Sequence, residues 1–307
     1  MSAWLPTAPC TPAGCATPQW PTAGRLTAFA RLIAGTAAVL AGVVLSPLAI
    51  PLGPPGRARL VALWCRTVIR AFGVRVRIVV PEETGPPGAG SWPGPGTLVV
   101  PNHISWLDIP LVATVLPGRM LAKKEVRQWP VLGPLAGFGG TLFVDRDRLR
   151  ALPGVVGAVA DSLRGGARVI VFPEGSTWCG REKGRFRNAA FQAAIDAGAT
   201  VQPVRITYGP VGAAAFVGDD PLAASLWRVA TAGGLTAEIR ILPPISAGRH
   251  TDRRSLARAA QAAVAGGADT SSAHTAVDND RANLPSVSVH HCDSFSPASA
   301  SSARTPS

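Results

Sequence analysis

The sequence predicts an α/β domain with a largely parallel sheet flanked by helices, preceded by an N-terminal membrane-associated helical element. From residue 74 onward, short runs rich in β-branched residues alternate with helical stretches, the pattern of a parallel sheet covered by helices. Residues 32–52 are almost wholly apolar, which matches the roughly 20 residues that a membrane-spanning helix needs. Both signals occur in one basic chain in which 47% of the residues are hydrophobic.

The first residues carry little pattern. Residues 1–24 contain Pro, Thr, Ala and Gly without periodicity, so we expect a disordered leader. The segment 25–73 follows as the membrane-associated helical element, and no charge occurs between Arg31 and Arg57. A buried core helix is the alternative interpretation of the apolar stretch. A cleaved signal peptide is not favoured, because the leader is long and no small-residue cleavage site follows.

The apolar stretch ends in a cluster of prolines: Pro47, Pro51, Pro54 and Pro55. Since proline ends helices, the segment either crosses the bilayer or stops early and enters one leaflet. Apolar residues then recur with helical spacing among arginines, which predicts an amphipathic helix that lies on a membrane or on the domain. Arginines are denser after the apolar stretch than before it, so we expect the domain on the cytoplasmic face of the cell membrane.

The domain itself is expected over residues 74–266. Its predicted strands are 74–80, 97–100, 120–122, 141–144, 168–172, 200–208 and 237–242. Its predicted helices are 105–115, 149–164, 188–197, 221–230 and 253–264. Residues 81–96 are rich in Pro and Gly and connect the first two strands, whereas residues 267–307 lose the hydrophobic pattern and predict a disordered tail.

The composition favours a membrane partner over a nucleic acid. The formal charge of +12 comes from 30 Lys and Arg against 18 Asp and Glu, and the mean hydropathy is +0.23. A basic and apolar chain suits an anionic membrane surface. Aromatic residues make up 6% of the chain and no zinc-finger, homeodomain or RNA-recognition signature occurs, so we expect no nucleic-acid partner.

The cysteines suggest neither disulfides nor a metal. The chain has an odd number of cysteines, their spacing follows no pattern, and no two of them form a CxxC pair: Cys10, Cys15, Cys65, Cys179 and Cys292. We therefore expect a reduced compartment, and no metal site. The triplet that ends in Cys292 offers adventitious metal ligands, but it lies in the predicted tail.

The segment from Asn102 to Asp108 reads NHISWLD. It sets His103 five residues before a carboxylate, directly after a predicted strand. An imidazole accepts a proton from a hydroxyl when one ring nitrogen is free and the other is held, and Asp108 is a candidate to hold it. The alternative is an Asn-His pair that caps a helix beside a solvated Asp108.

Other chemistry-bearing residues also follow predicted strands. Arg146 comes directly after the strand at 141–144, and a guanidinium there can bind a phosphate through two parallel hydrogen bonds, in bidentate geometry. Glu174 stands between Pro173 and Gly175, so the turn is expected to fix its carboxylate, with the glycine in an unusual backbone conformation. A turn glutamate facing water is the alternative for Glu174, and an ordinary surface arginine is the alternative for Arg146.

Two further features complete the set. Arg181, Lys183, Arg185 and Arg187 form a dense cationic run, suited to phosphate groups and equally typical of a solvated or membrane-facing loop. Pro203 interrupts an apolar strand, which predicts an edge strand or a bulge.

The ordered blocks NHxxxxD, GxxFVxR, FPEGS and VxPV resemble the glycerolipid acyltransferase superfamily, specifically the bacterial 1-acyl-sn-glycerol-3-phosphate acyltransferases. The resemblance spans about residues 98–208. It implies transfer of an acyl group from acyl-CoA or acyl carrier protein to a lysolipid hydroxyl, without a cofactor. It further implies these roles: His103 as base, Asp108 as its orienter, Asn102, Arg146, Glu174, Gly175 and Ser176 in substrate binding, and Pro203 in the acyl-binding wall.

One departure concerns the acceptor. Many family members that use lysophosphatidate carry an arginine soon after FPEG, whereas this chain reads FPEGSTW. Arg181 or Lys183 is the candidate replacement, and acyltransferases acting on lyso-ornithine lipid or other lysolipids are the alternative resemblance. A non-catalytic membrane lipid-binding protein also stays open. A serine hydrolase does not, because the GxSxG elbow is absent.

Overall fold

The computed structural model describes residues 8–80, 94–130, 132–145 and 148–266, all within Met1–Thr275, the first of two compact units of the chain. The strands are β1 Arg75–Val79, β2 Thr97–Pro101, β3 Arg119–Lys123, β4 Leu142–Val144, β5 Val169–Ile170, β6 Thr200–Gly209, β7 Thr236–Ile241 and β8 Ile245–Ser246. The helices are α1 Pro12–Cys15, α2 Arg25–Leu45, α3 Pro54–Ala71, α4 Asp108–Val115, α5 Leu132–Phe138, α6 Leu152–Arg164, α7 Ala189–Asp196, α8 Val211–Ala214, α9 Leu222–Thr231 and α10 Arg253–Gly266.

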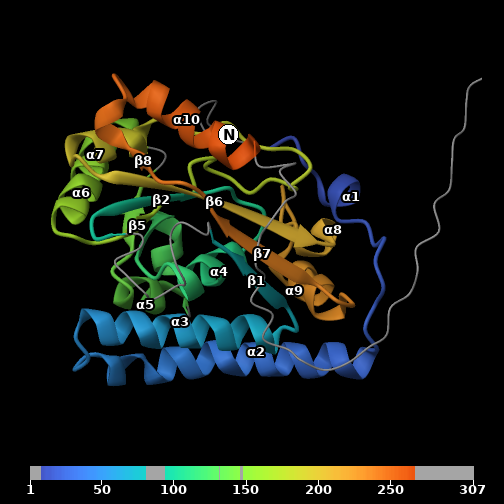
Figure 1. Cartoon of the computed structure of the whole chain (residues 1–307). Helices are drawn as coiled ribbons and strands as arrows, with labels where there is room; N and C mark the ends of the chain where they lie inside the picture. Colours follow the sequence, from blue (N-terminus) through green and yellow to red (C-terminus); the bar gives the residue numbers. More distant parts are fainter. Residues whose placement is uncertain (1–7, 81–93, 131, 146–147, 267–307) are drawn as a thin grey trace, which may run out of the picture. The chain divides into compact units, whose positions relative to one another are not determined.

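The strands form one sheet in the order β1-β7-β6-β2-β5-β3-β4, with β8 beside β6 (Figure 1). All neighbouring pairs are parallel except β6 with β7 and β6 with β8. The predicted α/β class with a largely parallel sheet is therefore confirmed. Every predicted strand and helix is present within a few residues of its expected bounds, whereas the short elements α1, α5, α8 and β8 were not predicted.

Helices cover both faces of the sheet (Figure 1). Along β2 the side chains alternate, so that Leu98 and Val100 join the apolar core under α6, α7 and α10. Val99 points the other way, into the core shared with α3, α4 and α9. Because β2 is buried on both faces, it reads as a continuous apolar run, as central parallel strands do.

The helical element 25–73 forms two helices that pack against each other. Glycines of α2 allow this approach, because a Cβ at Gly42 would lie 2.2 Å from the Trp64 indole, and one at Gly35 would lie 2.5 Å from the Phe72 ring. The Trp64 Nε1–H also donates to the carbonyl of Ala38 at 2.8 Å. The amphipathic helix α3 packs on the domain, where its Val68 and Ile69 side chains and the Phe72 side chain that follows it are buried.

The helical segment Arg25–Ala49, which includes α2, is long and apolar enough to cross a membrane, judged by length and composition alone. The most apolar 18 residues of this segment have a mean hydropathy of 2.1, and 11% of them are buried. Exposed apolar side chains of this helix recur at spacings of three, four or seven residues: Leu26, Phe29, Ile33, Leu40 and Val44. They form one apolar stripe along α2.

The expectation of a disordered leader is wrong for residues 8–24. Cys10 and Ala16 are buried, and Thr22 forms a β-bridge with Ala232. The backbone N–H of Ala23 donates to the carbonyl of Thr231 at 2.7 Å. The composition hides this order because the stabilising partners lie more than 150 residues away, beside α8 and α9. Residues 1–7 and the predicted tail 267–307 lie outside the described residues.

Candidate active site

The candidate residues meet because their strands are neighbours in the sheet. β2 lies between β5 and β6 and runs parallel to both, so the carboxyl ends of the three strands share one edge. That edge is the usual place for ligands in open α/β sheets. Asn102 and His103 follow β2, Glu174 follows β5, and Tyr208 lies near the end of β6.

His103 and Asp108 contact each other directly. His103 Nδ1 lies 2.8 Å from Asp108 Oδ2, and the two side chains are 17% and 0% exposed. The same carboxylate oxygen accepts the backbone N–H groups of Ile104 at 2.6 Å and Ser105 at 2.8 Å. Because an ionised carboxylate only accepts hydrogen bonds, Nδ1 is the donor in this pair. In the neutral imidazole Nε2 is then the nitrogen that can accept a proton.

The turn that precedes α4 creates this geometry. The helix was expected to begin at residue 105 but begins at Asp108. Residues 104 and 105 instead direct their N–H groups to the Asp108 carboxylate, in the first turn of the helix, where the N-terminal dipole also favours negative charge. The His103 ring stacks on Phe172 at a centroid distance of 4.1 Å, which fixes the plane of the imidazole.

The second oxygen of Asp108 has its own donor. Tyr208 Oη–H donates to Asp108 Oδ1 at 2.6 Å. Burial, together with the Asp108 charge and this hydrogen bond, raises the pKa of Tyr208 well above its ordinary value, so the phenol stays protonated as a donor. No sequence motif marks Tyr208, although it is the only tyrosine of the chain and the next-to-last residue of β6.

Glu174 links two parts of the site. Its Oε2 accepts the backbone N–H of His103 at 2.7 Å, and its Oε1 accepts that of Gly184 at 3.0 Å. The residue is 4% exposed. Burial raises the pKa of the Glu174 carboxyl to about 7, opposed by these two hydrogen bonds. The alternative of a turn glutamate facing water is therefore wrong. The Glu174 side chain is buried, and it connects the backbone of His103 to that of Gly184.

A cavity of about 280 Å³ opens beside the imidazole. Residues from the ends of β2 and β6, from the loop 174–186 and from α10 line it. Its walls are largely apolar, and the charged groups along it are Glu174, Glu182, Lys183 and Arg205. The arrangement thus places an imidazole, whose Nδ1 is held by Asp108, at the wall of a mostly apolar cavity with a polar rim.

The remaining residues predicted for this site are distributed around it. The Asn102 side chain donates to the carbonyl of Ile206 at 3.0 Å and accepts its N–H at 2.7 Å, so it joins β2 to β6 while lining the cavity. Gly175 has a φ of +78°, in agreement with the expected unusual backbone angle. The Ser176 hydroxyl is buried and finds no hydrogen-bond partner among the described residues.

The cationic candidates divide. Lys183 lines the cavity. Arg181 does not, because its Nη2 donates to the carbonyls of Cys15 at 3.0 Å and Gly14 at 3.4 Å. Arg146 lies outside the described residues.

Of the edge strand and the bulge predicted at Pro203, the edge strand is wrong, because β6 lies inside the sheet between β7 and β2. Proline is tolerated there because the partner on one side changes. β8 pairs with β6 at residues 200 and 201, and β7 pairs with it from Val204 onward. The imide nitrogen of Pro203 faces this interruption, where its carbonyl accepts the N–H of Leu242 at 3.1 Å. Pro203 does not line the cavity described above.

Comparisons with known proteins identify the family of the chain. The family model described as Acyltransferase matches residues 78–207. The chain is 36% identical over 218 residues to the lyso-ornithine lipid O-acyltransferase of Pseudomonas aeruginosa, covering 68% of this chain and 78% of that protein. It is 34% identical over 207 residues to the 1-acyl-sn-glycerol-3-phosphate acyltransferase of Neisseria meningitidis, covering 66% and 78%.

A solved structure shares the fold. The 1-acyl-sn-glycerophosphate (LPA) acyltransferase PlsC of Thermotoga maritima superposes with a TM-score of 0.61 at 20% identity, over 79% of this chain and 93% of that one. The fold class and the family resemblance inferred from the sequence are thus confirmed. By the match of its domain and by its identity to these relatives, the chain belongs to the acyltransferase family and is an acyltransferase of lysolipids.

Proposed function

We propose that this chain is a membrane-bound enzyme that moves a fatty acyl group from acyl-CoA or acyl carrier protein to the free hydroxyl of 1-acyl-sn-glycerol-3-phosphate, giving phosphatidate for phospholipid biosynthesis. The observation that carries the proposal is the pairing of His103 with a fully buried Asp108 at the wall of the cavity. The reaction requires no cofactor, because the donor is already an activated thioester.

In the proposed mechanism His103 Nε2 accepts the proton of the acceptor hydroxyl as the oxygen attacks the thioester carbonyl carbon. The tetrahedral intermediate then expels the thiolate, which takes the proton from the imidazolium. General base catalysis of this kind is worth about 10² to 10⁴-fold in rate. Asp108 does not take up the proton: its oxygens already accept four donors, so it orients the ring and stabilises the imidazolium.

The proposal is tested by His103→Ala. Turnover of labelled acyl-CoA with lysophosphatidate should fall by at least about 10²-fold, while the variant still reaches the membrane fraction. His250→Ala is the matched control, since His250 lies after β8 and outside the cavity lining. Near-normal turnover of His103→Ala would reject the assignment. Absence of activity toward every lysolipid in the wild-type chain would favour the lipid-binding alternative.

Lysophosphatidate as the acceptor is supported by cationic residues near the site. Lys183 lines the cavity, and the block ending in Arg146 matches the family pattern for an acceptor-phosphate ligand. The net charge of +12 also favours approach of phosphate-bearing substrates.

Lyso-ornithine lipid is a second candidate acceptor, favoured by two specific observations. The arginine expected soon after FPEG is absent, and Glu182 stands beside Lys183 on the cavity wall. An ornithine head group carries an ammonium and a carboxylate, so a neighbouring acid and base complement it. A phosphate monoester would instead be repelled by Glu182.

An acceptor panel with two variants separates the candidates. If lysophosphatidate is the acceptor, Lys183→Gln should raise its KM and Glu182→Gln should leave or lower it. If lyso-ornithine lipid is the acceptor, both variants should raise its KM. The panel compares lysophosphatidate, lyso-ornithine lipid and lysophosphatidylglycerol under one acyl-CoA donor, and the acceptor with the highest kcat/KM for the wild-type chain identifies the substrate.

The membrane association proposed here is monotopic. α2 lies along the domain: Arg31 Nη1 near its start donates to the carbonyls of Ala230 and Ala232 at 3.0 and 2.8 Å, and Gly42 near its end packs on α3. A helix held by the domain near its start and by α3 near its end, with α3 itself packed on the domain, does not cross a bilayer perpendicularly. Its exposed apolar stripe is suited to insertion into one leaflet, with the arginines of α3 at the lipid phosphates.

A further inference from the structure

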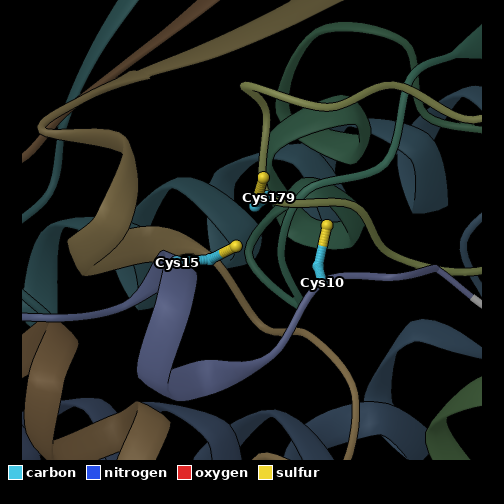
Figure 2. Close-up of side chains that lie close together, drawn as sticks. All are labelled: Cys10, Cys15 and Cys179. Carbon is cyan, nitrogen blue, oxygen red and sulfur yellow. The ribbon is translucent and has the colours of Figure 1, made fainter.

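Three cysteines that are distant in sequence gather beside the candidate active site. The Sγ atoms of Cys10, Cys15 and Cys179 all lie within 4.8 Å of one another, and all three residues are free thiols. Figure 2 shows the three sulfurs around a common space, with Cys15 at the end of α1, Cys10 on the segment leading into it and Cys179 on the loop that follows Glu174. Cys10 and Cys179 are 6% and 1% exposed.

We propose that Cys10, Cys15 and Cys179 form a binding site for a thiophilic cation of the Zn²⁺ type, which joins the N-terminal segment to the loop that carries Glu174. The proposal departs from the expectation, drawn from the cysteine spacing, that the chain has no metal site. The spacing did not reveal it, because two of the cysteines lie in the predicted leader and the third lies in the loop after Glu174, more than 160 residues later in the sequence.

The donor set and spacing suit such a cation. Cys10 and Cys15 are separated by four residues, as ligand pairs in structural zinc sites often are, and α1 folds the intervening chain into a single turn. Zn–S bonds of about 2.3 Å in a tetrahedral centre place sulfurs roughly 3.8 Å apart. The present separations reach that value by side-chain rotation, since the sulfurs already face one space.

The surroundings compensate the negative charge of three thiolates. The backbone N–H of Glu182 donates to Cys179 Sγ at 3.4 Å. The guanidinium of Arg181, which is bound to the carbonyls of Gly14 and Cys15, contributes a positive charge next to the cluster. Three thiolates and a divalent cation carry a net charge of −1, which one arginine neutralises.

The site is connected to the catalytic histidine through one residue. The backbone N–H of Trp178, directly before Cys179, donates to the carbonyl of His103 at 2.8 Å. Gly180, directly after Cys179, lines the cavity and has a φ of +82°. A cation held by Cys179 would therefore restrict the motion of this loop. The same loop carries Glu174, whose carboxylate accepts the backbone N–H of His103. An effect of this restriction on acyl transfer rests on the proposed function, whereas cation binding does not.

The test is a titration of the full chain, reduced with a non-thiol reductant in detergent, with Cd²⁺ as a spectroscopic probe for Zn²⁺. The wild-type chain should bind one cation per chain, with thiolate-to-metal charge-transfer absorption and an increase in Tm. Cys10→Ser, Cys15→Ser and Cys179→Ser should each lose most of the absorption, and the triple variant should lose the metal-dependent Tm increase whatever its own stability.

Two single variants serve as matched controls. Cys65→Ser removes a buried thiol on α3, away from the cluster, and Cys292→Ser removes the thiol next to His290 and His291. Both should bind Cd²⁺ as the wild type does. Retention of the absorption in the triple variant, or its loss in Cys292→Ser, would overturn the proposal. A disulfide between two of the three cysteines that resists the reductant and prevents Cd²⁺ binding would also overturn the proposal.

Discussion

The Asp108 carboxylate accepts four hydrogen bonds within the candidate site. It is fully buried, yet each oxygen is satisfied: Oδ2 by His103 and two backbone N–H groups, and Oδ1 by Tyr208. A buried charge is tolerated only when it is hydrogen-bonded in this way. The same bonds fix its position, so that the imidazole has one orientation.

Replacing Tyr208 by Phe tests whether the phenol positions this carboxylate. The change removes a single oxygen and leaves Asp108 Oδ1 without its donor. We expect kcat to fall about tenfold, equivalent to about 1.4 kcal/mol, with KM for both substrates unchanged and an altered pH profile of kcat. Phe216→Leu, at a half-buried position after α8 and outside the cavity lining, is a control for general loss of packing. Equal changes in both variants would assign Tyr208 a packing role alone.

Glu174 should make stability depend on pH. Its pKa is about 7 in the folded chain against an ordinary 4.5, so between these values the folded chain holds a proton that the unfolded chain has lost. Its contribution to stability is therefore full below about pH 4.5 and decreases as the pH rises to about 7. The slope for one proton is at most about 1.4 kcal/mol per pH unit.

Denaturant unfolding of the wild type and of Glu174→Gln, measured from about pH 5 to about pH 8, checks this slope. The free energy of unfolding of the wild type minus that of the variant should decrease across this range. Glu182→Gln changes a carboxylate on the same loop that is exposed, and should retain the wild-type slope. A constant difference for Glu174→Gln would show that its carboxylate titrates normally.

At the scale of elements, strand order explains which sequence predictions succeeded. The blocks after β2 and β5 each followed a recognisable apolar run, so their residues could be identified from the sequence. The register of β2 between β5 and β6 then brings them together. The contact of Tyr208 with Asp108 depends on this strand order, and no local pattern predicts it.

The α2–α3 pair depends on the absence of side chains at two glycines. Gly42→Ala should lower the free energy of unfolding by about 1–3 kcal/mol, because the new Cβ would lie 2.2 Å from the Trp64 indole. Gly157→Ala on α6 is the matched control. A Cβ added at Gly157 would have no atom of another segment within 4 Å. The change should therefore stabilise the chain by roughly 0.5–1 kcal/mol through the higher helix propensity of alanine. Denaturant unfolding in detergent measures both, and equal effects would contradict the close packing.

At the scale of the whole molecule, the exposed stripe of α2 should determine membrane binding. Burial of each Leu-sized side chain in lipid is worth roughly 1.5–3 kcal/mol. The triple variant Leu26→Gln, Ile33→Gln and Val44→Gln should therefore bind anionic vesicles at least about a hundredfold more weakly. Sedimentation with vesicles measures this loss.

Thr27→Ala with Thr36→Ala is the matched control for the stripe, since both threonines are exposed on α2 and the change removes no large apolar side chain. This variant should bind vesicles as the wild type does. Full binding by the triple glutamine variant would exclude the stripe as the membrane anchor. Protease protection of spheroplasts would test the proposed cytoplasmic orientation.

The sequence by itself determined what depends on neighbouring residues: the alternation of strands and helices, the apolar helix, and the motif blocks with His103, Asp108 and Glu174. Periodicity and turn chemistry are local, so they can be read along the chain. Only the tertiary structure decided what depends on distant partners: the order of residues 8–24, the donor from Tyr208, the strut from Glu174 to Gly184 and the gathering of Cys10 and Cys15 with Cys179. These contacts exist because strand order and helix packing bring together segments that share no local pattern.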